Sequence, residues 1–364
     1  MFARITLIIA AVLYLVVLGC VASTPAEERR PAVPAEQFPP ATRPNSLDGL
    51  PLRAVGIQVQ RVDWMDRYKQ SIDEIAALGA DAVKIVVDAR QENGTSSKIY
   101  LDMRMTPAAE QLADLIRHAK GRGLRVILMP IVLLDQPRGN EWRGTLKPES
   151  WSDWFKSYRE MLGHFAWIAE GNGVDVFVVG SELVSSETRV EDWRQTIAFI
   201  RERFSGKLTY SSNWDHYTVV PFWDQLDLIG MNSYWKLGRD HTVTLDQIKQ
   251  RWSEIQRDLL PFVQRTGKPL LFLEVGWCSM ENAAHEPWDY TKNVPIDLDL
   301  QARLYEGFFQ SWHGNPLLGG FSIWEWTPDG GGPEDRGYTP RGKPAEITLR
   351  EWLARGAWDV MPER

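Results

Sequence analysis

Two glutamates each end an almost wholly apolar run of this sequence. Glu182 closes the run Val174–Glu182, and Glu274 closes the run Leu270–Glu274. A carboxylate at the end of a buried segment is unfavourable unless a partner or a reactant stabilises its charge. Each glutamate could form a salt bridge with an Arg or Lys at the rim of the fold. Because two such glutamates end two separate apolar runs, we favour the alternative that the two carboxyl groups act together in a reaction.

A pair of carboxyl groups in one site can work on the two sides of a single bond. One group donates a proton to the leaving oxygen, while the other, ionised, attacks carbon or activates water. Neighbouring charges separate the pKa values of such a pair, so that the two roles can coexist. This is the requirement for cleaving a glycosidic bond, and the two glutamates therefore indicate that chemistry.

The elements that must hold these glutamates form a repeating pattern. From residue 52 onward, short apolar runs alternate with stretches of helical periodicity, which is typical of a parallel sheet built from βαβ units. The expected strands are Ala54–Gln60, Ala82–Asp88, Arg125–Leu133, Val174–Glu182, Lys207–Asn213, Leu226–Ser233, Leu270–Glu274 and Gly320–Trp326. The expected helices are Trp64–Leu78, Pro107–Arg122, Trp151–Glu170, Glu191–Phe204, Leu245–Thr266 and Leu298–Trp312.

Eight such strands over about 300 residues predict an α/β fold, a single (β/α)8 TIM barrel. An open doubly wound sheet is the alternative, but the sequence has no G-x-G-x-x-G phosphate loop. In a TIM barrel the chemistry lies at the carboxyl ends of the strands, where Glu182 would end the fourth strand and Glu274 the seventh. Strand alternation predicts that Val178, Gly180 and Glu182 face the barrel axis, and it gives Glu274 the parity of Phe272.

The 17 Trp residues are unusually many and divide into two groups. Nine fall on expected helices or the C-terminal tail, where we expect them to pack. Eight fall at or after expected strand ends, where an indole could cover the C–H face of a sugar; they are Trp64, Trp142, Trp214, Trp235, Trp277, Trp288, Trp324 and Trp326.

Three further features of the sequence could have either a structural or a functional role. Lys84 and Asp88 share an inward parity and could form a buried pair that supports the barrel; a sugar contact by Asp88 is the alternative. Arg143 and Asp135 could bind sugar hydroxyls or form a salt bridge with each other. Cys278 has no His placed to activate it, so we interpret it as a small buried residue.

The N-terminal sequence predicts a targeting signal followed by a flexible tether. Residues 1–19 combine Arg4 with a short apolar run, and Val17-Leu18-Gly19-Cys20 resembles a bacterial lipobox. We therefore expect a lipoprotein signal peptide over 1–19, a lipid on Cys20, a disordered Pro-rich tether over 20–50 and a catalytic domain over 51–364. An uncleaved signal anchor is the alternative. The expected location is the bacterial cell envelope, at the outer membrane if the cell is Gram-negative.

Composition excludes several other classes of protein. The charge sum is 41 − 48 = −7, with no long basic run, which disfavours nucleic-acid binding. Two cysteines cannot form a disulfide scaffold, and the six scattered histidines show no metal-ligand spacing. We expect no metal, no cofactor and a monomer.

An ordered set of short motifs resembles glycoside hydrolase family 113, a clan A family of β-mannanase-like enzymes. The motifs span roughly residues 52–356, and they include Glu141-Trp142-Arg143-Gly144, Gly180-Ser181-Glu182-Leu183, Asn213-Trp214, Phe272-Leu273-Glu274-Val275-Gly276-Trp277, Trp324-Glu325-Trp326 and Gly337-Tyr338-Thr339-Pro340. The resemblance implies a retaining enzyme that cleaves β-linked, β-mannan-type polysaccharide or oligosaccharide. The sugar, the linkage and endo or exo action are left open.

The same resemblance implies roles for individual residues. Glu182 would be the general acid/base, Glu274 the nucleophile, Tyr234 a hydrogen-bond donor to Glu274, and Trp324 the floor of the sugar site. Ser181 replaces the Asn that usually precedes the acid/base in the clan, and Asn213 or Asn232 could take its place. The remaining candidate substrate-binding residues are Trp326, Trp277, Arg143 and Trp64. The competing hypothesis is a surface-tethered carbohydrate-binding barrel that has lost catalysis.

Overall fold

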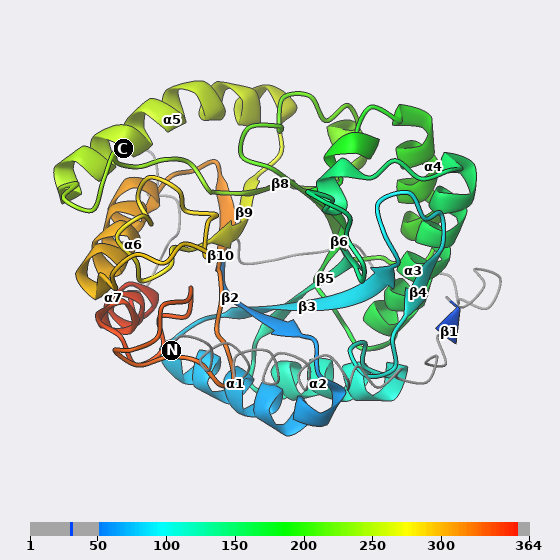
Figure 1. Cartoon of the computed structure of the whole chain (residues 1–364), viewed down its shortest axis with the longest axis horizontal. Helices are drawn as coiled ribbons and strands as arrows, with labels where there is room; N and C mark the ends of the chain where they lie inside the picture. Colours follow the sequence, from blue (N-terminus) through cyan, green and yellow to red (C-terminus); the bar gives the residue numbers. More distant parts are fainter. Residues whose placement is uncertain (1–29, 32–50, 356–364) are drawn as a thin grey trace, which may run out of the picture.

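Eight parallel strands close into a barrel in this computed structural model, which describes residues 30–31 and 51–355 (Figure 1). Neighbouring strands pair in chain order, and pairing of the eighth strand with the first completes the ring. The TIM barrel expected from the sequence is therefore confirmed. The barrel strands are β2 (Leu52–Val59), β3 (Ala82–Gln91), β5 (Arg125–Leu134), β6 (Val176–Ser181), β7 (Lys207–Ser212), β8 (Ile229–Asn232), β9 (Leu270–Val275) and β10 (Leu318–Ile323).

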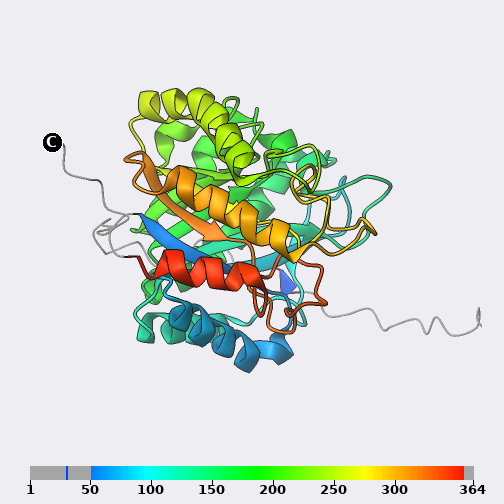
Figure 2. The same cartoon turned by 90° about the vertical axis from the view of Figure 1, so that its left-hand side faces the viewer.

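Helices surround the strands, as Figures 1 and 2 show. All six expected helices are present, and two of them, α5 and α6, have the expected bounds. The sequence reading omitted the short strand β4 (Ile99–Leu101) and the last helix, α7 (Pro344–Leu353). The α-helices that were expected are α1 (Met65–Leu78), α2 (Ala109–Gly121), α3 (Trp151–Gly171), α4 (Val190–Arg201), α5 (Leu245–Thr266) and α6 (Leu298–Trp312). Short 3-10 helices are η2 (Val62–Trp64), η3 (Arg143–Thr145), η4 (Val184–Ser186) and η5 (Trp223–Gln225).

Local sequence explains where several helices begin and end. Ser150 caps α3 by accepting a hydrogen bond from the Asp153 amide, and Asp297 caps α6 in the same way through the Leu300 amide. Thr244 and Gln247 form a capping box at the start of α5. Gly267 ends α5 with a φ of 66°, a conformation that glycine adopts without steric cost.

The apolar side chains form two packed layers. Val176, Val178, Leu271 and Leu273 belong to a cluster inside the barrel. A larger cluster lies between the barrel and the helices, and it contains Phe177 and Val179 together with Phe272. Val178 therefore faces the barrel axis, as expected, and its neighbours Phe177 and Val179 face the helices.

Alternation breaks down at the ends of the strands that carry the two glutamates. A Cβ on Gly180 would lie 2.7 Å from the Trp193 ring and 2.9 Å from the Tyr210 ring, so Gly180 faces the helix layer and not the axis. The pairing of β6 with β7 shifts register between Val178 and Ser181. A similar shift follows Phe272 in β9, and it separates the orientation of Glu274 from that of Phe272. The expectations for Gly180 and for the parity of Glu274 were wrong because these strand ends are irregular.

Most of the predictions about the N-terminus concern residues outside the described part of the chain. The signal peptide over 1–19, the lipid on Cys20 and the tether stay predictions for that reason. Within the predicted tether, the structure describes only β1 (Arg30–Pro31), which pairs antiparallel with β4. Among the described helices, none has the length and apolar character needed to cross a bilayer.

Candidate active site

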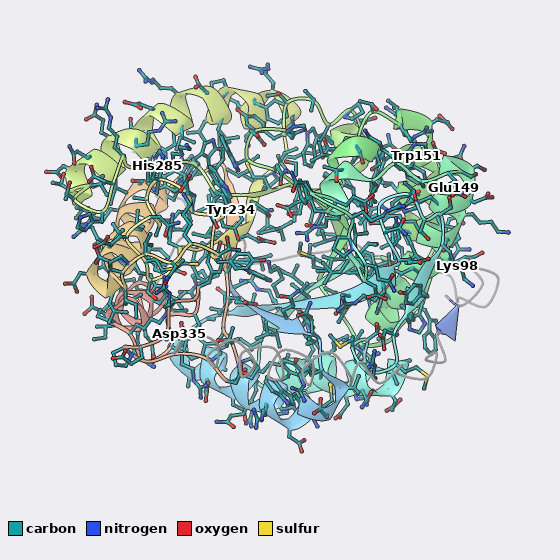
Figure 3. The ribbon with its side chains drawn as sticks, in the orientation of Figure 1. Lys98, Glu149, Trp151, Tyr234, His285 and Asp335 are labelled. Atoms are coloured by element: carbon teal, nitrogen blue, oxygen red, sulfur yellow. The ribbon has the colours of Figure 1, made fainter. Side chains whose placement is uncertain are left out.

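A cleft of about 810 Å³ opens at the carboxyl ends of the barrel strands and contains both predicted glutamates. Glu182 follows β6, the fourth barrel strand, and Glu274 lies in β9, the seventh. Tyr234, which also lines the cleft, lies near the middle of the ring in Figure 3. The barrel therefore brings together residues that are far apart in the sequence.

The Glu182 carboxylate is held from both sides. One oxygen contacts the Arg143 guanidinium, and the other accepts a hydrogen bond from the Asn232 amide. Asn232 is itself oriented, because its amide oxygen accepts a hydrogen bond from Ser211 Oγ at 2.8 Å. Glu182 has a φ of 54°, which is unusual for a residue other than glycine and is found most often at functional sites. This backbone conformation turns the side chain into the cleft.

Glu274 lies in a drier environment than Glu182. Its carboxylate accepts a 2.7 Å hydrogen bond from the Tyr234 hydroxyl, and the Lys84 ammonium lies 4.0 Å from its other oxygen. Burial raises the pKa of Glu274, while the charge of Lys84 lowers it and the nearby Glu182 raises it further. The role expected for Tyr234, as a donor to Glu274, matches this geometry.

Lys84 is fully buried in β3 and does not pair with Asp88. Its ammonium donates to the Leu273 carbonyl at 2.5 Å and lies 4.5 Å from the centre of the Trp324 ring. Burial lowers the pKa of Lys84 to about 8, although Glu274 opposes this shift. Asp88 instead pairs with Arg90 at 2.7 Å. Residues four apart on one strand share a face but are too distant to touch, which is why the predicted Lys84–Asp88 pair was wrong.

Four of the eight strand-end Trp residues line the cleft, and Trp324 is one of them. The other three are Trp142, Trp214 and Trp288. Trp214 and Trp288 stack with their ring centres 6.3 Å apart. The Trp142 ring lies so close to Gly144 that a Cβ there would come within 2.3 Å of it. These indoles provide apolar walls around the carboxyl groups.

Three Trp residues that were assigned to substrate binding lie elsewhere, and so does Trp235, which is 7% exposed and packs against Trp252. Trp277 is fully buried and packs edge-on against Tyr305. Trp326 is 3% exposed and donates its indole N–H to Glu74 at 2.8 Å. Trp64 packs partly on the core and contacts the guanidinium groups of Arg61 and Arg67. All three were misassigned because a position at a strand end does not determine which way a side chain points.

The other predicted site residues have mixed outcomes. Asn213 and Arg143 line the cleft, whereas Asn232 is buried beneath it and acts on Glu182. Asp135 does not pair with Arg143; it lies 3.6 Å from the Arg90 guanidinium and accepts a hydrogen bond from the Tyr100 hydroxyl. Ser181 Oγ is buried and has no hydrogen-bond partner within the described part of the chain.

The sequence reading assigned no role to several cleft residues. Gln58 and Gln60 project from the end of β2, and Glu325 and Tyr338 lie in the segments after β10. Gln58 has the inward parity of Ala54, a signal that alternation offered. Glu325 and Tyr338 lie within the family-like motifs, which is the only sequence signal they carry.

Two remaining features carry no sign of chemistry. Cys278 is 2% exposed, and burial raises the pKa of its thiol to about 12, which agrees with a packing role. Over residues 30–31 and 51–355, no group of three or more His, Cys, Asp or Glu side chains is arranged to hold a metal ion.

Comparison with known proteins gives a consistent family and fold. A sequence profile described as Glycoside Hydrolase Family 113 matches residues 54–343. The GH113 β-mannanase AaManA from Alicyclobacillus acidocaldarius, in complex with ManMIm, is 30% identical with a TM-score of 0.75, over 85% of this chain and 98% of that one. A GH113 β-1,4-mannanase complex is 26% identical with a TM-score of 0.76, over 85% of this chain and 100% of that one.

More distant structures share the fold alone. A β-glucuronidase from Faecalibacterium prausnitzii is 14% identical with a TM-score of 0.58, over 85% of this chain and 50% of that one. A search of the curated proteins gave no match.

The barrel, the cleft and these comparisons define the class of protein: it is a glycoside hydrolase with a TIM-barrel fold. Within that class the profile match covers most of the chain. The protein belongs to Glycoside Hydrolase Family 113.

Proposed function

We propose that the protein hydrolyses β-mannan-type polysaccharide or oligosaccharide with retention of configuration. The observation that carries this proposal is the asymmetric surroundings of two glutamates in one cleft. Tyr234 donates a hydrogen bond to Glu274, and Lys84 places a positive charge near it. Arg143 and Asn232 instead contact the two oxygens of Glu182. The similar GH113 structures, whose titles name β-mannanases, support the choice of mannan.

The reaction would take two steps. In the first, Glu182 in its acid form donates a proton to the glycosidic oxygen as the bond from that oxygen to the anomeric carbon breaks. The Glu274 carboxylate attacks that carbon from the opposite face and forms a glycosyl ester. In the second step, the Glu182 carboxylate takes a proton from water, water attacks the anomeric carbon, and Glu274 leaves as a carboxylate. Trp324 would cover the apolar face of the reacting sugar throughout.

The alternative of a barrel that only binds carbohydrate receives less support from the contacts. A protein without catalysis has no use for a carboxylate buried against a tyrosine donor and a lysine, because burial of that charge is unfavourable.

The test is release of reducing ends from β-1,4-mannan by the wild type, Glu274→Ala and Glu182→Ala. We expect Glu274→Ala to abolish release, and Glu182→Ala to slow it by roughly 10²–10⁴-fold, the usual contribution of general acid–base catalysis. External azide should rescue Glu182→Ala on an aryl glycoside and give the β-glycosyl azide, whereas with Glu274→Ala it should give the α-azide. If the two variants gave the opposite azides, Glu182 would be the nucleophile and Glu274 the acid/base. No release by the wild type from any β-linked polysaccharide would leave only the binding hypothesis.

A further inference from the structure

Besides Glu182, Glu274 and the exposed Asp215, the cleft contains a half-buried carboxyl group that the two-glutamate mechanism does not use. Glu325 follows directly after Trp324 and lines the same cleft as Glu182 and Glu274. Burial raises the pKa of Glu325 to about 7, with Lys84 opposing the shift and Glu274 adding to it. A carboxyl group in such a position needs hydrogen-bond donors to offset its loss of water.

Those donors are not supplied by the part of the protein that the structure describes. Within residues 51–355, the Glu325 carboxyl forms no hydrogen bond and no ion pair. Lys84, whose charge acts on it, is already engaged by the Leu273 carbonyl and lies nearer to Glu274. The unused hydrogen-bonding capacity of Glu325 therefore faces the space that a ligand would occupy.

The backbone fixes Glu325 between two barrel strands. The Trp324 amide donates to the Val275 carbonyl of β9, and the Trp326 amide donates to the Gly56 carbonyl of β2, each at 2.8 Å. Residues 324–326 thus bridge the two strands that flank β10. This anchoring holds Glu325 beside the inward-facing end of β2, which carries Gln58 and Gln60 into the cleft.

Trp324 determines which part of a sugar would reach Glu325. Lys84 covers the Trp324 ring from the barrel interior, and Gly56 leaves room for both, since a Cβ there would lie 3.4 Å from the ring and 3.1 Å from Lys84 Cε. The part of the ring that lines the cleft remains for a ligand. A sugar stacked on an indole directs its hydroxyls outward around its edge, toward polar side chains next to the ring.

We propose that the Glu325 carboxylate binds two neighbouring hydroxyl groups of the sugar that stacks on Trp324, and so selects for a sugar unsubstituted at those hydroxyls. The inference rests on the proposed function, because it places a sugar on Trp324. An ionised carboxylate has two oxygens with about four acceptor sites, so it matches a pair of adjacent O–H donors. Glu325 is then a specificity residue that binds substrate without taking part in bond cleavage.

The experiment combines protein variants with deoxygenated substrates. The enzymes are the wild type, Glu325→Gln, Glu325→Ala and the control Glu160→Gln. The substrates are the β-1,4-linked 4-nitrophenyl β-mannobioside and its 2-, 3- and 6-deoxy derivatives, altered in the sugar next to the aryl group, whose free hydroxyls are at these three positions. Glu160 is a matched control because it is also partly buried, yet it lines a separate polar groove with Lys98 and Glu149, at the outer edge of the ring in Figure 3.

We expect kcat/KM on the parent substrate to fall by about 10- to 100-fold in Glu325→Ala, the usual effect of losing a hydrogen bond to a charged group. Glu325→Gln should lose less, because its amide keeps one acceptor. The wild type should lose a similar factor on the substrate that lacks a bound hydroxyl. On that substrate Glu325→Ala should cause little further loss, while Glu160→Gln should match the wild type on every substrate.

Equal losses by Glu325→Ala on all the substrates would overturn the proposal, because they indicate a structural role with no bound hydroxyl. Unchanged kinetics in Glu325→Ala and Glu325→Gln would overturn it as well. If the wild type cleaves neither mannan nor the mannobiosides, the proposed function itself has failed. If the wild type cleaves the parent substrate, but the loss caused by Glu325→Ala is the same with and without each hydroxyl, the Glu325 proposal fails and the proposed function stands.

Discussion

Glu274, the proposed nucleophile, depends on its neighbours to keep its negative charge. Burial raises the pKa of this carboxyl, and the positive charges of Lys84 and Arg143 and the hydrogen bond from Tyr234 act in the opposite direction. The Tyr234 hydroxyl keeps its proton for donation, because burial and the Glu274 charge hold the pKa of Tyr234 well above its ordinary value. The ionised fraction of Glu274 is thus set by a balance between burial and the charges and hydrogen bonds of nearby groups.

Replacing Tyr234 by Phe should move the acidic limb of the pH–rate profile to higher pH. The nucleophile must be ionised, so activity is lost as the pH falls through the pKa of Glu274. Removing a donor to the carboxylate raises that pKa and brings the loss at a higher pH. We expect kcat/KM at neutral pH to fall by about 10- to 100-fold, from a charged hydrogen bond worth about 1.5–3 kcal/mol. Steady-state rates between about pH 4 and pH 9 measure both the position of the acidic limb and the fall in kcat/KM, because carboxyl groups titrate toward the lower end of that range.

Tyr290→Phe is the control for this substitution. Tyr290 also lines the cleft, but it is 67% exposed and is not hydrogen-bonded to Glu274. Its profile should overlay that of the wild type. An unshifted acidic limb in Tyr234→Phe would mean that Glu274 does not need this donor to remain ionised.

Residue chemistry was more predictable than residue orientation. Tyr234 was predicted from the family resemblance, and Glu182 and Glu274 were predicted because a polar side chain at the end of an apolar strand is conspicuous. Trp277 and Trp326 were placed in the cleft by the same argument, yet both are buried in the core. Indole is large and apolar enough to serve either purpose, so its type and spacing do not distinguish a sugar platform from packing.

The positions of the strands could be predicted from the sequence, but the orientation of the side chains at the ends of β6 and β9 could not. Apolar runs and amphipathic stretches located all eight barrel strands and six helices to within a few residues. The three-residue strand β4 is too short to show a periodic pattern, whereas α7 buries Ala345, Leu349, Trp352 and Leu353 at helical spacing, a signal that the sequence offered. The register shifts at the ends of β6 and β9 arise from contacts between strands, which periodicity along a single strand does not contain.

The bend at the end of β6 makes Gly180 a sensitive position for both stability and activity. A Cβ there would come within 2.7 Å of the Trp193 ring and 3.1 Å of the Tyr158 hydroxyl oxygen, and all of these groups are buried. We expect Gly180→Ala to lower the free energy of unfolding by about 1–3 kcal/mol, the usual effect of overpacking a core. Because Glu182 is two residues away, kcat should fall as well. Urea unfolding and mannan hydrolysis measure the two effects.

Gly121→Ala is the matched control for Gly180→Ala. No heavy atom lies within 4 Å of a Cβ built on Gly121, at the end of α2. That variant should be as stable as the wild type or slightly more so, and fully active. A Gly180→Ala protein with unchanged stability and kcat would show that β6 can relax without moving Glu182.

The whole molecule has a charge distribution suited to an uncharged substrate. The chain carries a net charge of −7, and the four carboxyl groups that line the cleft, those of Glu182, Glu274, Glu325 and Asp215, outnumber the opposing charges of Arg143 and the underlying Lys84. Like charges would oppose entry of an acidic polysaccharide, and the effect would weaken with added salt. Neutral mannan meets no such barrier, which agrees with the proposed substrate.

The final prediction concerns how the folded domain is attached to the cell. We propose that Cys20 becomes the lipidated first residue of the mature protein, because Leu18-Gly19-Cys20 follows a short apolar run that is typical of a secretory signal. More than one acyl chain on the cysteine would be needed for stable anchoring. All the cleft residues lie between Gln58 and Tyr338, so the anchor and the chemistry should be separable.

In a bacterial host, the full chain should therefore sediment with membranes, and mass spectrometry should find an acylated peptide that begins at Cys20. Cys20→Ser should leave the membrane fraction while keeping the wild-type kcat/KM on a soluble oligosaccharide. Cys278→Ala is the control, because Cys278 is buried and its loss should not alter the partition. A mature N-terminus near Ala22 without lipid would refute the anchor. An intact N-terminus that remains in the membrane would instead support the uncleaved signal anchor.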